Sequence, residues 1–361
     1  MIKQGWFIKL LKIVSKNFIF SGIFVLILII IALTIFKNST LLNKPERTPF
    51  INTPTNEDQK QVHPLMIEQM KEKEYPGSNL KIEEQLDPGS NYQRYIASYL
   101  SEGLIIYGLL TVPSGQKPEN GWPVIIFNHG YIPPEQYRTT ERYVAYVDGF
   151  ARNGYLVFKP DYRGNGNSQG EPEGAYYSPA YTTDVLNALS SIKRYPGVNP
   201  LKIGMWGHSL GGNITLRSLV VSSDIKAAVI WGGVVGSYQD MMNNWRHSTS
   251  WRPSQREESV MRPNRQRFID TYGLPEQNPQ FWDSISPLNY LSDISGPVQI
   301  HHGLADDEVP WEFSQSLSQE LEKQGKTYEY YTYPGGDHNL SGADFNTAMQ
   351  RSVEFFDKYL K

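Results

Sequence analysis

The sequence contains no cysteine. Disulfide bonds, a cysteine nucleophile and cysteine-ligated zinc sites are therefore excluded. Neither sign of charge is in large excess, since the formal net charge is −3 at pH 7. The chain thus lacks the basic footprint of a nucleic-acid-binding protein, and we expect no nucleic-acid partner. What remains is a chain of 361 residues, which suffices for one large α/β domain or two small ones.

One long hydrophobic run stands near the N-terminus. Residues 18–36 are almost wholly apolar and uncharged, and as a helix these 19 positions would span about 28 Å, close to the thickness of a bilayer core. We predict a single transmembrane anchor here. The alternatives are a signal peptide, although no small-x-small cleavage site follows the run, and a buried core helix.

The flanks of this run predict its orientation. Lysines are slightly more frequent before the run than after it, which favours a cytoplasmic segment 1–17 and a catalytic domain outside the cytoplasmic membrane. Residues 37–75 are polar and rich in Pro, Thr, Asn, Glu and Lys, so they are predicted to form a stalk, with His63 exposed to solvent. The predicted catalytic domain then covers residues 76–361.

The domain shows an alternation of strand and helix patterns. Two β-rich runs, 92–100 and 104–112, predict an antiparallel hairpin at its start. Further strands are expected at 123–128, 155–160, 202–206, 227–231, 297–302 and 327–333. Helices are expected at 143–152, 182–194, 210–222, 310–323 and 343–360. This order predicts an α/β fold with a mostly parallel central sheet and helices on both faces. Residues 235–291 interrupt the alternation, and we interpret them as a helical cap insert.

The stretch that carries chemistry is Gly207-His208-Ser209-Leu210-Gly211, between a predicted strand and a predicted helix. Gly-x-Ser-x-Gly in that setting is typical of a nucleophile elbow, a strained turn that exposes the serine hydroxyl. Ser209 is the predicted nucleophile. The amide of Leu210, at the start of the helix, is a predicted oxyanion donor.

A serine nucleophile needs a histidine base and a carboxylate that orients it. After an elbow serine, the acid comes first along the chain and the histidine second. Asp306 follows one predicted strand and His338 follows the next, so both belong at the same edge of the sheet as Ser209. Asp307 is the alternative acid. For the other aspartate and histidines of these motifs and strands we predict structural roles. Asp337 is predicted to be a turn residue, and His208, His301 and His302 are predicted to pack in the core.

Residues 92–361 resemble an α/β-hydrolase, and are most similar to the catalytic domain of the prolyl oligopeptidase family and its dienelactone-hydrolase-like relatives. The elbow matches at Gly207–Gly212, the acid motif Gly-x-Ala-Asp-Asp-x-Val at Gly303–Val309, and the final Asp-His at Asp337-His338. In that family the first aspartate of the acid motif is the acid, which implies Asp306. The spacing from Asp306 to His338 is also that of the family.

The resemblance also implies a second oxyanion donor, and the position of the cap insert over the carboxyl ends of the strands indicates a pocket. The amide of Tyr131 would be the second oxyanion donor. The family often has a tyrosine at the position of His129, whereas esterases of this fold commonly have histidine there. His129, Trp245, Trp251 and Arg252 are the candidates for a substrate pocket, with packing and solvent exposure as the alternative for the cap residues.

The predicted function is that of a membrane-anchored serine hydrolase that works through an acyl-enzyme and needs no metal or organic cofactor. The resemblance favours a serine-type peptidase acting on a peptide. The alternative is a carboxylesterase acting on a small ester, because the segment ahead of the domain is too short for a propeller domain. A remote alternative is a non-catalytic binding protein on the same fold. The sequence leaves the oligomeric state open.

Overall fold

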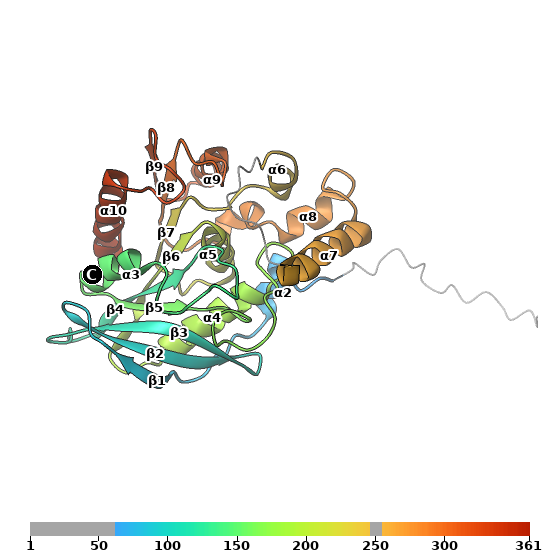
Figure 1. The fold of residues 1–361 in the computed structure, drawn as a ribbon. Helices are drawn as coiled ribbons and strands as arrows, with labels where there is room; N and C mark the ends of the chain where they lie inside the picture. The colour runs from blue at the N-terminus through green and yellow to red at the C-terminus, as the bar shows by residue number, and fades with distance from the viewer. Residues whose placement is uncertain (1–61, 246–254) are drawn as a thin grey trace, which may run out of the picture. The chain divides into compact units, whose positions relative to one another are not determined.

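A nine-stranded sheet forms the centre of the structure, a computed structural model that describes residues 62–245 and 255–361 (Figure 1). The strands lie in the order β1-β2-β3-β5-β4-β6-β7-β8-β9. Their bounds are β1 Lys81–Leu86, β2 Tyr92–Ser101, β3 Leu104–Pro113, β4 Trp122–Asn128, β5 Leu156–Pro160, β6 Val198–His208, β7 Ala227–Trp231, β8 Val298–Gly303 and β9 Tyr328–Tyr333. The β1–β2, β2–β3 and β3–β5 pairs are antiparallel and the others are parallel, as predicted for a mostly parallel sheet.

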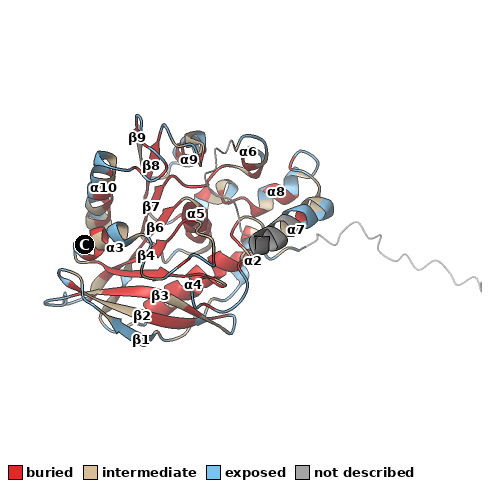
Figure 2. Cartoon of the chain, viewed as in Figure 1, coloured by how far each residue is buried: buried red, intermediate tan, exposed pale blue. Residues whose placement is uncertain are grey.

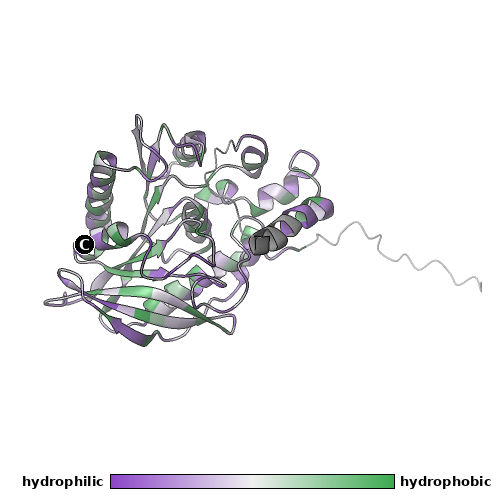
Figure 3. Cartoon of the chain, in the orientation of Figure 1, coloured by the Kyte–Doolittle hydropathy of each residue, from purple (hydrophilic) through white to green (hydrophobic). Residues whose placement is uncertain are grey.

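The predicted hairpin is present as β2 and β3. Ser101 pairs with Leu104, so two residues make the turn, and both Glu102 and Gly103 have positive φ angles of 51° and 81°. Such a turn matches the right-handed twist of the flanking strands. Strand β1 was not predicted, because its sequence is polar and five of its six residues are exposed at the edge of the sheet (Figure 3).

Helices cover both faces of the sheet. Their bounds are α2 Ile67–Glu72, α3 Val144–Ala151, α4 Ala180–Ile192, α5 Leu210–Val221, α6 Tyr238–Asn243, α7 Gln255–Tyr272, α8 Pro279–Ile285, α9 Trp311–Lys323 and α10 Ala343–Leu360, with a 3-10 helix at Pro287–Asp293. On β4, Val124 and Ile126 join the core under α4, α5 and α9, whereas Ile125 and Phe127 join the core under α3 and α10. This alternation explains why the central strands are buried on both faces (Figure 2).

The insert at 235–291 is helical where the structure describes it, as predicted, and contains α6, α7, α8 and the 3-10 helix. Trp282 is 3% exposed, and its ring lies against those of Tyr238 and Phe268. This tryptophan, on α8, therefore packs against α6 and α7 within the insert.

The domain begins earlier than predicted. Leu65, Ile67 and Met70 are buried in the core, and Nη1 of Arg217 donates hydrogen bonds to the carbonyl oxygens of Leu65 and Ile285 at 3.3 and 2.9 Å. His63 packs edge-on against Phe268, at 4.9 Å between ring centroids. The prediction of a stalk was therefore wrong for residues 62–75. Their overall composition is polar, but the apolar side chains of Leu65, Ile67 and Met70 are buried in the core.

The membrane anchor predicted at 18–36 lies outside the described residues, together with segment 1–17 and residues 37–61. Within residues 62–245 and 255–361, no helix has the length and apolar character needed to cross a bilayer.

Candidate functional site

Ser209 occupies a strained turn between β6 and α5. Its φ and ψ angles are 55° and −120°, a combination that costs a residue with a side chain about 1–3 kcal/mol. A Cβ atom on Gly207 would lie 2.3 Å from the carbonyl oxygen of Gly211, and one on Gly211 would lie 2.0 Å from that of Asn128. Both positions therefore require glycine. The amide of Ser209 donates to the carbonyl oxygen of Trp231 at 3.0 Å, which fixes the turn against β7.

Asp306 and His338 lie on the loops that follow β8 and β9. Nδ1–H of His338 donates a hydrogen bond to Oδ2 of Asp306 at 2.7 Å. Oδ1 of the same carboxylate accepts from the backbone amides of Glu308 at 2.9 Å and Val309 at 2.8 Å. Asp306 is thus the aspartate of this motif whose carboxylate is hydrogen-bonded to His338.

A second histidine contacts the same carboxylate. Nε2 of His302 lies 3.1 Å from Oδ2 of Asp306 and 3.1 Å from the carbonyl oxygen of Val309, and its Nδ1 lies 2.6 Å from Oγ of Ser314. Because both partners of Nε2 are acceptors, Nε2 carries the proton and Ser314 donates to Nδ1. Burial alone would raise the pKa of Asp306, but the hydrogen bonds from His302 and His338 outweigh it and hold this pKa well below its ordinary value.

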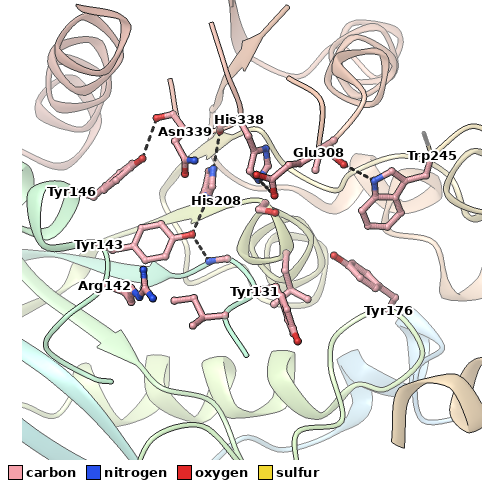
Figure 4. Close-up of a pocket in the computed structure, with 15 residues that line it drawn as sticks. Tyr131, Arg142, Tyr143, Tyr146, Tyr176, His208, Trp245, Glu308, His338 and Asn339 are labelled. Carbon is pink, nitrogen blue, oxygen red and sulfur yellow. Dashed lines mark hydrogen bonds and ion pairs between the residues drawn. The ribbon is translucent and has the colours of Figure 1, made fainter. Parts of the chain in front are cut away.

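The elbow serine and the histidine face a common cavity of about 490 Å³, whose lining residues are drawn in Figure 4. Ser209 and His338 line it, as do the two predicted oxyanion donors, Leu210 and Tyr131. The rest of the lining is mostly aromatic and apolar, with two charged residues, and consists of Gly130, Ile132, Arg142, Tyr143, Tyr146, Tyr176, His208, Trp245, Glu308, Val309 and Asn339. The volume is in the range of small-ligand sites.

A chain of hydrogen bonds joins the two sides of this cavity. The amide of Gly130 donates to the hydroxyl of Tyr143 at 2.9 Å. That hydroxyl lies 2.7 Å from Nδ1 of His208, whose Nε2 lies 2.9 Å from the carbonyl oxygen of His338. A carbonyl only accepts, so Nε2–H of His208 donates to it and the Tyr143 hydroxyl donates to Nδ1. The loop that carries Tyr131 is thereby linked to the loop that carries His338.

His208 is consequently more than a packing residue. It is 2% exposed, and burial lowers its pKa to about 3, so it stays neutral at ordinary pH and keeps the tautomer that this chain of hydrogen bonds requires. Sequence reasoning missed this role, and it missed Tyr143 altogether, because contacts between residues 65 and 130 positions apart leave no local pattern.

The predicted pocket residues have different outcomes. Trp245 lines the cavity, and its Nε1 donates to the carbonyl oxygen of Glu308 at 2.8 Å. His129 is not among the lining residues, since it is 1% exposed and stacked between Tyr137 and Tyr162. Trp251 and Arg252 lie outside the described residues.

In the part of the chain that the structure describes, no three histidine, aspartate or glutamate side chains are grouped so as to hold a metal ion.

Glu308 lines the cavity and was not predicted as a site residue. The sequence could have indicated it, because it stands inside the acid motif, two residues after Asp306.

Comparison with known proteins decides the family. The profile of the prolyl oligopeptidase family matches residues 142–361, which is 361 − 142 + 1 = 220 residues and more than half of the chain. The chain belongs to the prolyl oligopeptidase family. With its elbow serine, it is a serine hydrolase.

Three individual proteins illustrate what the chain is similar to. The uncharacterised peptidase YtmA of Bacillus subtilis is 26% identical over 255 residues, which are 70% of this chain and 88% of that protein. An acylaminoacyl peptidase of Pyrococcus horikoshii has a TM-score of 0.60 at 21% identity, over 75% of this chain and 42% of that one. An acetyl xylan esterase from a Paenibacillus species has a TM-score of 0.59 at 17% identity, over 81% of this chain and 92% of that one.

The two structural likenesses show the α/β-hydrolase fold. The chain spans most of YtmA but less than half of the Pyrococcus enzyme. The α/β-hydrolase fold with its mostly parallel sheet, the family and the serine hydrolase class are thus confirmed.

Proposed function

We propose that this protein is a serine peptidase that cleaves peptides through an acyl-enzyme, with Ser209, His338 and Asp306 as its catalytic triad. One observation carries the proposal: the histidine that is hydrogen-bonded to Asp306 at 2.7 Å lines the same cavity as the strained elbow serine. Membership of the prolyl oligopeptidase family supports peptide bonds as the target.

In the proposed mechanism, Oγ of Ser209 attacks the carbonyl carbon of the substrate while Nε2 of His338 takes the hydroxyl proton. His338 then returns this proton to the leaving amine, and water repeats the sequence on the acyl-enzyme. Asp306 accepts from Nδ1–H and stabilises the imidazolium that forms between the two transfers. Because its pKa is held low, Asp306 remains a carboxylate throughout.

The oxyanion of the tetrahedral intermediate would be held by the backbone amides of Leu210 and Tyr131, both of which line the cavity. The amide of Gly130 is directed elsewhere, since it donates to the hydroxyl of Tyr143. This arrangement gives the neighbouring Tyr131 amide a fixed position, which is the condition for stabilising charge in the transition state.

A carboxylesterase is the second candidate. It is favoured by the likeness to an acetyl xylan esterase, which this chain covers over 92% of its length. The same triad serves both reactions, so substrate assays must separate them. We expect the purified full-length protein to release arylamine from short aminoacyl and peptidyl arylamides, and Ser209→Ala to abolish this release.

The comparison substrates are the esters of the same acyl groups. Turnover of the esters with no detectable turnover of the arylamides, at equal labelling of Ser209 by a fluorophosphonate, would replace the peptidase proposal by the esterase one.

We further propose that residues 18–36 anchor the protein in the membrane, with the catalytic domain on the extracytoplasmic side. The support is their length and uniform apolar character. In intact cells stripped of their outer layers, added protease should cut between residues 38 and 61 and release the domain. Complete protection until lysis would reverse the topology, and recovery of the whole chain in the soluble fraction would refute the anchor.

A further inference from the structure

A second carboxylate lies beside His338, on the side opposite Asp306. Glu308 and His338 are both drawn in Figure 4, and Oε2 of Glu308 is 4.0 Å from Nε2 of His338. Asp306 is hydrogen-bonded to the other ring nitrogen, Nδ1. Nε2 is the nitrogen that exchanges the proton with Ser209 in the proposed mechanism. Glu308 therefore places negative charge next to the reacting atoms.

The backbone of Glu308 is fixed at both ends. Its amide donates to Oδ1 of Asp306 at 2.9 Å, and its carbonyl oxygen accepts from Nε1 of Trp245 at 2.8 Å. The side chain is 29% exposed and lines the cavity. Among the described residues its carboxylate accepts no hydrogen bond, and 4.0 Å from Nε2 is too long for one. A half-buried carboxylate in this position calls for a cationic partner.

From this geometry we propose that Glu308 binds the free α-ammonium group of the residue whose carbonyl carbon Ser209 attacks, so that the enzyme removes N-terminal residues from peptides. The inference rests on the proposed function. The nitrogen of an α-amino group lies only about 2.5 Å from the carbonyl carbon of the same residue. An α-ammonium group at this distance from the scissile carbonyl carbon can reach the carboxylate of Glu308 beside Nε2 of His338. The charge on a lysine or arginine side chain lies several bonds further from that carbon.

The remaining lining determines which residue fits. Tyr131, Tyr176, Trp245 and Val309 give the cavity aromatic and apolar walls. Such walls favour an apolar side chain on the residue that carries the ammonium group. The substrate class is thus a short peptide with an unblocked, apolar N-terminal residue.

The test compares substrates that differ only in the α-amino group, namely leucine p-nitroanilide and N-acetylleucine p-nitroanilide, and the benzyl esters of the same two acyl groups. Assays at about pH 6 keep the α-amino group protonated. We expect the full-length protein to prefer the unblocked member of each pair in kcat/KM. In Glu308→Gln this preference should fall about tenfold, as expected for a partly screened ion pair.

Asp307→Asn is the matched control, because it removes one negative charge from the adjacent exposed residue, which does not line the cavity. This variant should keep the preference of the wild type. An equal fall of kcat/KM on blocked and unblocked substrates in Glu308→Gln would overturn the proposal and make Glu308 a support for His338. A wild type that prefers the blocked substrates would overturn it as well.

The ester pair separates this inference from the proposed function. If the anilides are not cleaved but the esters are, the peptidase proposal fails, while the preference for an ammonium group and its dependence on Glu308 are still read from the esters. If the anilides are cleaved without such a preference, the peptidase proposal stands and the role of Glu308 is refuted.

Discussion

Replacing Tyr143 by phenylalanine removes one hydroxyl from the chain of hydrogen bonds that links the two sides of the cavity. The ring can stay, since it packs edge-on against Phe127 and Tyr146. Two polar atoms lose their partner: the amide of Gly130 and Nδ1 of His208. An unsatisfied buried group costs about 1–3 kcal/mol, so we expect Tyr143→Phe, which leaves two such groups, to lower the free energy of unfolding by about 2–6 kcal/mol.

The effect on catalysis has a different origin. Without the hydroxyl, Gly130 and His208 are no longer joined, and the Tyr131 amide and the His338 backbone can shift relative to Ser209. Displacements of this kind cost about tenfold to a hundredfold in rate, so kcat should fall by that factor while KM changes little. The measurements are steady-state kinetics on an arylamide, with active sites counted by fluorophosphonate titration, and thermal unfolding.

Tyr155→Phe is the control, because Tyr155 is also buried and its hydroxyl donates to Asp357 at 2.6 Å, on helix α10, from which no residue lines the cavity. This variant should lose stability but keep its kcat per titrated site. If Tyr143→Phe behaves in the same way, the hydroxyl is merely structural and the argument that it positions the site is refuted.

Three further predictions follow from the same contacts. Asp306→Asn should lower kcat by about 10⁴-fold, because the amide presents an N–H to His338, whereas Asp307→Asn should be mild; the reverse ranking in steady-state assays would contradict the acid assignment. Gly211→Ala should unfold well below the wild type in a thermal melt, because its Cβ would lie 2.0 Å from the carbonyl oxygen of Asn128. Burial lowers the pKa of His129 and His208 from 6.5 to about 3, so the unfolded chain binds more protons between these values. Their contribution to stability is thus complete above pH 6.5 and is lost as the pH falls toward 3; a melting temperature that stays constant down to about pH 4 would contradict this.

The parts of the fold that could be predicted are those with a local pattern. The buried parallel strands are short apolar runs, and the elbow and acid motifs carry their glycines and acids at fixed spacing, which placed Ser209, Asp306 and His338 at one edge of the sheet. Strand β1 could not be predicted, because it is an exposed edge strand with a polar sequence and its register is set by pairing with β2.

The residues that support the site could not be predicted either. His302 belongs to a predicted buried strand, where a packing role is expected. The contact of its Nε2 with Asp306 depends on the tertiary structure. The link from Gly130 through Tyr143 and His208 to His338 joins three distant parts of the chain. Residues 62–75 have the composition of a linker, and their burial depends on a complementary surface on α5 that becomes visible only after folding.

The identity of the nucleophile is the central claim, and labelling with a fluorophosphonate followed by peptide mapping tests it most directly. We predict a single stoichiometric adduct on Ser209 in the wild type, with loss of arylamide hydrolysis in proportion to labelling, and neither labelling nor hydrolysis in folded Ser209→Ala. A stoichiometric adduct on another serine, or hydrolysis that persists in Ser209→Ala at the rate of the wild type, would contradict the account.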